Sequence, residues 1–120
     1  MPRPVHFEFA AQDPERAAEF YKNVFGWKIQ KWEGPMEYYM VLTGEGQGID
    51  GGITRAQEGL QPTVNTMDVA NLDEMVEKVV AAGGQVIMPR MAVPGVGWLA
   101  YCVDTEGIQF GLMENDPNAQ

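Results

Sequence analysis

The chain contains one pattern twice, and this duplication constrains its fold more than any other feature. Residues 5–27 and residues 64–84 each read as a strand with alternating apolar side chains, followed by a helix that begins at a polar cap and ends at glycine. Short strand-like runs follow both copies. A repeat of this length indicates two copies of one supersecondary unit, here β-α-β-β-β, that build one structure together.

The first copy carries clear signals at both ends of its helix. Residues 5–9 alternate apolar and polar side chains, which predicts a half-buried strand. Asp13 supplies a helix cap, Pro14 takes the first helical position, and Gly26 ends the helix. Three further strands are predicted at residues 27–32, 38–43 and 49–55.

The second copy repeats this order. After a predicted strand at residues 64–68, Asn71 caps a helix with Glu74 three residues later, and a double glycine ends it at residues 83–84. Strands are predicted at residues 85–88, 98–103 and 108–114, with a long loop over residues 88–97. We interpret residues 1–120 as one domain, with the first repeat over about residues 4–55 and the second over about residues 62–114.

The charge balance excludes two kinds of partner. The formal net charge is −9, whereas binding to nucleic acid needs a clustered basic face and anionic membrane surfaces attract basic residues. We therefore expect neither a nucleic acid nor a membrane as partner. No segment reaches the roughly 18 apolar residues of a membrane span, and the first residues carry no signal pattern. Cys102 is the only cysteine, so we expect no disulfide framework, a buried structural thiol and a cytoplasmic location.

Three segments are specific enough to indicate a family: VHFEF, DPERAAEFYKNVFGW and GGQVIMPRMAVPGVGWLAYCVDTEGIQFGLME. Together they resemble single-domain members of the vicinal oxygen chelate superfamily, which includes glyoxalase I, extradiol dioxygenases, fosfomycin-modifying enzymes and bleomycin-resistance proteins. The resemblance implies an α+β fold in which two β-α-β-β-β repeats form a curled, half-barrel-like mixed sheet around a cleft, with the helices outside. It also implies a homodimer and, in the metalloenzymes, a divalent metal in the cleft.

The resemblance places the ligands of that metal on the first and last strands of each repeat. In this sequence the four positions read His6, Gly52, Val64 and Gly111. A metal in a cleft needs three or four converging ligands, and only His6 of these residues can supply one. A slip of one residue in register would present Asn65 in place of Val64, which is also a poor ligand. Strand alternation adds other side chains on the cleft side: Glu8, Asp50, Thr54, Thr66, Gln109 and Met113.

Three interpretations of His6 stay open. It could be a structural histidine with a local hydrogen bond, or it could hold a divalent cation weakly together with Glu8 and Asp50. It could also contact a bound small molecule without any metal. Glu8 is the candidate general base, because it lies two residues from His6 on the same strand face.

The glycines at the ligand positions suggest a roomy cleft, because glycine inside a strand often marks the close approach of a ligand. Aromatic and methionine side chains nearby favour an apolar or aromatic small molecule with a few polar contacts. The residues predicted to bind this ligand are His6, Asp50, Gly52, Thr54, Trp98, Gln109, Gly111 and Met113.

These observations favour a metal-independent small-molecule-binding protein of the glyoxalase and bleomycin-resistance type. The alternative is a glyoxalase-like lyase or isomerase that uses a weakly held divalent metal at His6. A third class, a purely structural partner module, stays open because no firm active-site motif is present.

Overall fold

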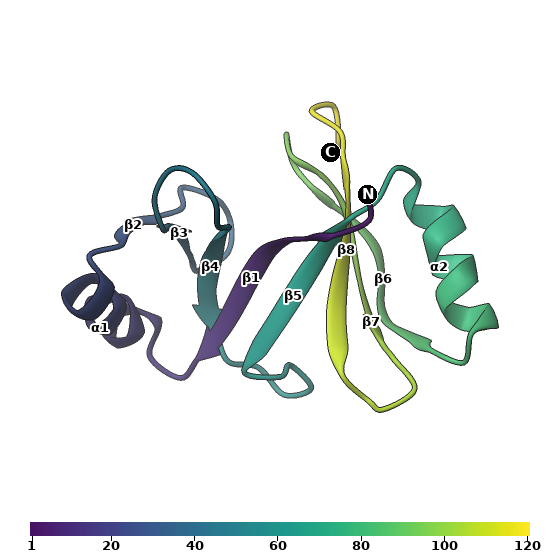
Figure 1. The fold of residues 1–120 in the computed structure, drawn as a ribbon, viewed down its shortest axis with the longest axis horizontal. Coiled ribbons are helices and arrows are strands. Elements are labelled where there is room, and N and C mark those ends of the chain that lie inside the picture. Colours follow the sequence, from purple (N-terminus) through teal and green to yellow (C-terminus); the bar gives the residue numbers. More distant parts are fainter. The chain divides into compact units, whose positions relative to one another are not determined.

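The computed structural model describes residues 1–120 as two compact units, each of which holds most of one repeat. The first-half unit is residues His6–Val64, and the second-half unit is residues Asn65–Gln120 together with Met1–Val5. The chain forms two helices and eight strands, labelled in Figure 1. This confirms the predicted α+β class with two β-α-β-β-β repeats.

The two repeats have the same topology. The first consists of β1 (Pro4–Ala11), α1 (Pro14–Phe25), β2 (Lys28–Lys31), β3 (Tyr38–Leu42) and β4 (Asp50–Arg55). Its strands follow the order β2-β3-β4-β1, with β1 and β4 parallel and the other neighbours antiparallel. The second consists of β5 (Thr63–Asp68), α2 (Leu72–Ala81), β6 (Gln85–Val93), β7 (Gly97–Val103) and β8 (Gln109–Asn115). Its order is β5-β8-β7-β6, again with the first and last strands parallel.

Both helices begin at the predicted caps. The Asp13 carboxylate accepts the backbone N–H of Arg16 at 3.1 Å, and the Asn71 side chain accepts that of Glu74 at 3.0 Å. Gly26 ends α1 with a φ of 71°, a left-handed conformation that glycine adopts without strain. Neither helix combines the length and the apolarity that crossing a membrane would require.

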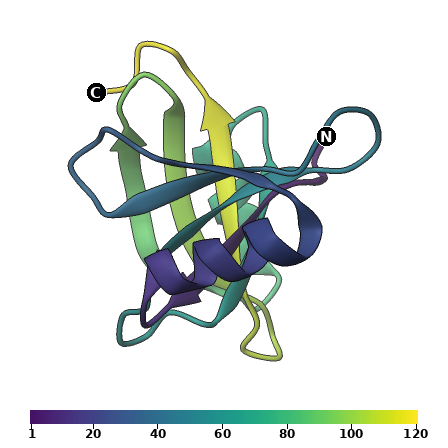
Figure 2. The ribbon, with the colours of Figure 1, turned by 90° about the vertical axis from the view of Figure 1, so that its left-hand side faces the viewer.

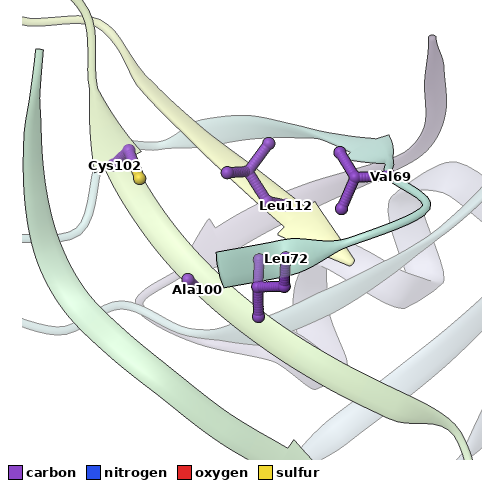
Figure 3. Packing of buried hydrophobic residues seen from close by; sticks show 5 residues of the cluster. All are labelled: Val69, Leu72, Ala100, Cys102 and Leu112. Atoms are coloured by element: carbon purple, nitrogen blue, oxygen red, sulfur yellow. The ribbon is translucent and has the colours of Figure 1, made fainter. Parts of the chain in front are cut away.

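Each helix packs on one face of its own sheet. In the first-half unit, Ala18 of α1 packs against Val41 of β3 and Ile53 of β4, and α1 is the helix that faces the viewer in Figure 2. In the second-half unit, the core contains Val69, Leu72, Ala100, Cys102 and Leu112 (Figure 3). Cys102 is fully buried there, as predicted for a structural thiol. In each sheet, the face turned away from the helix is left for other contacts.

Strand β6 is longer than predicted. The sequence suggested an end at Met88 and a loop beyond it, whereas the strand continues through Pro89 to Val93. Proline is tolerated because β6 pairs only with β7, so one side of the strand needs no N–H donor. The pairing shifts register on either side of Met88, which is how a bulged edge strand accommodates a proline.

Candidate functional site

The predicted polar residues of the first repeat lie together on the sheet face turned away from α1. Phe7 packs into the core beneath α1, so strand alternation places His6 and Glu8 on the opposite face. The parallel register of β1 and β4 pairs His6 with Asp50 and Glu8 with Gly52. These four residues are therefore neighbours in space, and we call their surroundings the His6 face.

A hydrogen bond between His6 and Tyr38 is the central contact of this face. The Nε2 atom of His6 lies 2.8 Å from the Tyr38 hydroxyl, and the tautomer of the ring decides which group donates. Burial lowers the pKa of His6, an effect that the Asp50 carboxylate partly offsets. Burial, together with Glu8, raises the pKa of Tyr38. Both groups are therefore neutral at pH 7.

The space above Gly52 is filled, contrary to the expectation of a roomy cleft. A Cβ atom at this position would overlap the hydroxyl and the ring of Tyr38. In the second-half unit, a Cβ atom at Gly111 would lie 2.6 Å from the Thr66 hydroxyl and 3.3 Å from the Tyr101 ring. The two matched glycines thus make room for side chains of their own sheets, and not for open space.

Tyr38 is the residue whose importance the sequence interpretation missed. Tyr38 pairs with Thr54 across β3 and β4, diagonally from Gly52. A long ring placed diagonally from a strand glycine has a free surface to lie on, and this pattern could have indicated the contact. The Trp32 ring meets the Tyr38 ring edge to face, with centroids 6.2 Å apart.

Asp50 and Thr54 make contacts within their own unit. The Asp50 carboxylate accepts the Thr43 backbone N–H at 2.9 Å and the Thr43 hydroxyl at 3.2 Å, which closes the connection between β3 and β4. The buried Thr54 hydroxyl donates to the carbonyl of Glu37 at 3.4 Å. Both side chains therefore support the strands that carry His6 and Tyr38.

The predicted residues of β8 share one face of the second-half sheet. Phe110 and Leu112 pack toward α2, so alternation turns Gln109, Gly111 and Met113 to the opposite face. The register with β5 pairs Gly111 with Thr66. This confirms the predicted β5 register, in which Thr66 faces away from the helix.

Trp98 does not lie on that face. Its side chain packs against the core beneath α2, on the same side of β7 as Ala100. The indole N–H donates to Asp116 at 3.1 Å, and the Arg90 guanidinium lies 4.3 Å from the ring centroid. The structure therefore separates Trp98 from Gly111 and Met113, with which it was predicted to line a cleft.

Known proteins resemble this chain over most of its length. The family model described as bleomycin resistance protein-like N-terminal matches residues 3–44. CFP32 of Mycobacterium tuberculosis, which is named as a candidate glyoxylase, is 29% identical over 119 residues that cover 92% of this chain and 45% of that protein. The anthracycline biosynthesis protein DnrV of Streptomyces peucetius is 27% identical over 126 residues that cover 91% and 46%. The chain thus spans a little under half the length of these curated relatives.

Solved structures share the fold at low sequence identity. Methylmalonyl-CoA epimerase from Mycobacterium tuberculosis superposes with a TM-score of 0.72 at 14% identity, covering 95% of this chain and 88% of the epimerase. A glyoxalase/bleomycin resistance protein/dioxygenase superfamily member from Vibrio splendidus gives 0.65 at 15% identity, covering 97% and 100%. The chain shares the fold of these proteins. Its Bacillus halodurans neighbour, a hypothetical protein, gives 0.73 at 13% identity over 99% and 98%.

The donor groups on the His6 face do not fit a divalent metal. No three His, Cys, Asp or Glu side chains lie close enough together to hold one. At the four ligand positions implied by the family, Gly52, Val64 and Gly111 offer no side-chain donor, and the Nε2 atom of His6 is bonded to Tyr38. We therefore derive no chemical step through a metal.

Two shallow surface hollows lie away from the His6 face. One adjoins the start of α2 and includes Met1, Val69 and Asn71, and the other lies between α1 and β2 and includes Ala18 and Tyr39. Neither contains His6 or Tyr38. Within the His6 face, Gly52 is buried, His6 and Glu8 are half-buried and Asp50 is exposed.

The titration of His6 tests the electrostatics of this face. Burial lowers the pKa of His6, so the stability that this group contributes is present above pH 6.5 and is lost as the pH falls through the lowered pKa. His6 is the only histidine, so its ring gives one set of NMR signals. We expect a titration midpoint below 6.5, and a lower one in Asp50→Asn, because asparagine keeps the acceptor for Thr43 but loses the charge. A wild-type midpoint at or above 6.5 would contradict this description.

Proposed function

We propose that this protein binds a small molecule on the His6 face without a metal ion. The observation that carries the proposal is the hydrogen bond between His6 and Tyr38, because it engages the ring nitrogen and lays the phenol over Gly52. A neutral imidazole and a neutral phenol can exchange this bond for one to a ligand. The protein would then act by binding, as bleomycin-resistance-type members do, and not through Lewis-acid chemistry.

The composition of the face supports an apolar or aromatic ligand with one or two polar groups. Met40 of β3 lies directly across from Gly52, and 37% of its surface is exposed. Methionine is flexible and polarisable, and it adapts to ligands of varied shape. Next to it, the paired His6 and Tyr38 offer a donor and an acceptor that fix orientation.

Three residues of β8 stay proposed ligand contacts of the second-half unit. Gln109, Gly111 and Met113 are kept as proposed ligand contacts, because all three lie on the face of their sheet that α2 does not cover. If the bound molecule reacts, Glu8 is the proposed general base. The negative charge of its carboxylate helps to raise the pKa of the Tyr38 hydroxyl, so Glu8 acts on the same face.

A cytoplasmic homodimer completes the proposal. The matched curated relatives are about twice as long as this chain. Each therefore contains, besides the matched segment, a further segment of about the same length. Phe20, Val24 and Phe25 of α1 are each more than half exposed, which suits a partner surface. A monomeric mass in sedimentation at micromolar concentration would refute the dimer.

The decisive experiment is a ligand titration in the presence of EDTA, followed through the ring signals of His6. We expect a small aromatic ligand to shift these signals, and Tyr38→Phe to weaken binding by about tenfold, since it removes one buried hydrogen-bonding group. Tyr39→Phe is the matched control, because Tyr39 lies next to Tyr38 in sequence but packs toward α1. Binding that appears only after a divalent metal is added would instead support the metal-dependent lyase or isomerase.

A further inference from the structure

We propose that Tyr38 is the residue that keeps a divalent metal out of the His6 face. Its phenol occupies the space that a ligand side chain at position 52 would need in order to reach His6. This inference goes beyond small-molecule binding, because it assigns to the Tyr38 ring the exclusion of a metal ligand from position 52 and the engagement of His6. It rests on the proposed function only in using the same face of the sheet.

Position 52 is the place from which an additional ligand would approach. In the parallel register of β1 and β4, Gly52 pairs with Glu8, and the preceding pair on the same face is His6 with Asp50. Neighbouring strands are about 4.8 Å apart, so a side chain at position 52 would emerge beside all three of these groups. A carboxylate there would complete a set of one imidazole and three carboxylates, which suits zinc or manganese.

The phenol of Tyr38 blocks this position and His6 at the same time. Its hydroxyl is 2.8 Å from the Nε2 atom of His6, the nitrogen that faces position 52. A Cβ atom at Gly52 would overlap both the hydroxyl and the ring. One side chain therefore engages the existing nitrogen ligand and excludes a new oxygen ligand.

Neighbouring contacts hold the phenol in place. The Trp32 ring meets the Tyr38 ring edge to face, and Trp32 in turn lies so close to Gly34 that a Cβ atom at Gly34 would overlap its indole. The remaining carboxylates are also partly committed, since Asp50 accepts two hydrogen bonds from Thr43. The wild-type face thus has no ligand at position 52, has its imidazole engaged by Tyr38, and has no three His, Asp or Glu side chains close enough together to hold a metal.

The test removes the Tyr38 ring and introduces a carboxylate at position 52, in order to turn the His6 face into a zinc site. In untagged protein, Tyr38→Val/Gly52→Glu removes the overlapping ring atoms and supplies the carboxylate, and zinc chloride is the probe. We expect the His6 ring signals of this variant to shift and saturate at one equivalent of zinc, with an affinity at least tenfold above that of the wild type. Tyr38→Val/Gly52→Gln is the matched control, because glutamine has the same length but no charge, and it should bind at least tenfold more weakly than the glutamate variant.

Two outcomes would overturn the proposal. One is a wild-type protein whose His6 signals saturate with one equivalent of zinc while Tyr38 is present. The other is a folded Tyr38→Val/Gly52→Glu variant that binds zinc no better than the wild type. The proposed function is tested separately, by the ligand titration of the wild type in EDTA. If the double variant does not fold, Tyr38→Val alone decides, because freeing His6 should raise the zinc affinity above the wild-type value, and an unchanged affinity would refute the role of Tyr38.

Discussion

Replacing Gly51 with alanine is expected to lower the free energy of unfolding by about 3 kcal/mol. A Cβ atom at this buried position would overlap the backbone carbonyl of Phe7 and its ring. Phe7 is the residue paired with Gly51 across β1 and β4, so relief would require separation of the two strands. Urea unfolding of the variant and the wild type under identical conditions measures the difference.

Gly52→Ala is the matched control, since it makes the same change one residue further along the strand. There the Cβ atom would meet only the far end of the Tyr38 side chain, which can move more easily than a paired backbone. We expect a cost of about 1 kcal/mol, most of it removed in Tyr38→Val/Gly52→Ala. Tyr38→Val should give no such relief to Gly51→Ala. Equal costs at the two positions would show that the overlap with the Phe7 backbone is not the cause.

The alternation of side chains along each strand made much of the fold predictable. Polar and apolar residues alternate cleanly in residues 5–9, and the same rule placed Thr66 on the face away from α2, where the structure has it. The helix ends were equally predictable, because Asp13, Asn71 and Gly26 act through contacts with residues only a few positions away. Signals of this kind are local, so the chain alone contains them.

The filling of the His6 face was less predictable, because it depends on how far a side chain reaches across a strand. Gly52 alone is compatible with an open space or with a neighbouring ring, and only the position of Tyr38 in the β3–β4 register distinguishes them. Trp98 illustrates a related limit: a tryptophan on a strand is compatible with a cleft lining or with the core until the strand face is known. Pro89 was read as the start of a loop because its tolerance depends on β6 being an edge strand.

These differences change the meaning of the duplication for function. Gly52 and Gly111 occupy matched positions, and each is covered by groups of its own sheet that include a tyrosine ring. The two glycines are covered by different groups, the Tyr38 ring at Gly52 and chiefly the Thr66 hydroxyl at Gly111. On the first-half sheet the Tyr38 ring also brings its hydroxyl to His6, so packing and chemistry are coupled at that one residue.

Leu72→Ala is expected to lower the free energy of unfolding by about 3 kcal/mol, because Leu72 is fully buried among Val69, Ala100, Cys102 and Leu112. The backbone N–H of Leu72 donates to the Glu114 carboxylate at 2.8 Å, and alanine keeps this bond, so the loss reports side-chain packing alone. Val80→Ala on the same helix is the control: its side chain is 55% exposed, and we expect a change within about 0.5 kcal/mol. Urea unfolding followed by circular dichroism measures both variants. A small loss in Leu72→Ala would mean that the core collapses to fill the cavity, and that α2 is held chiefly by its cap and its bond to Glu114.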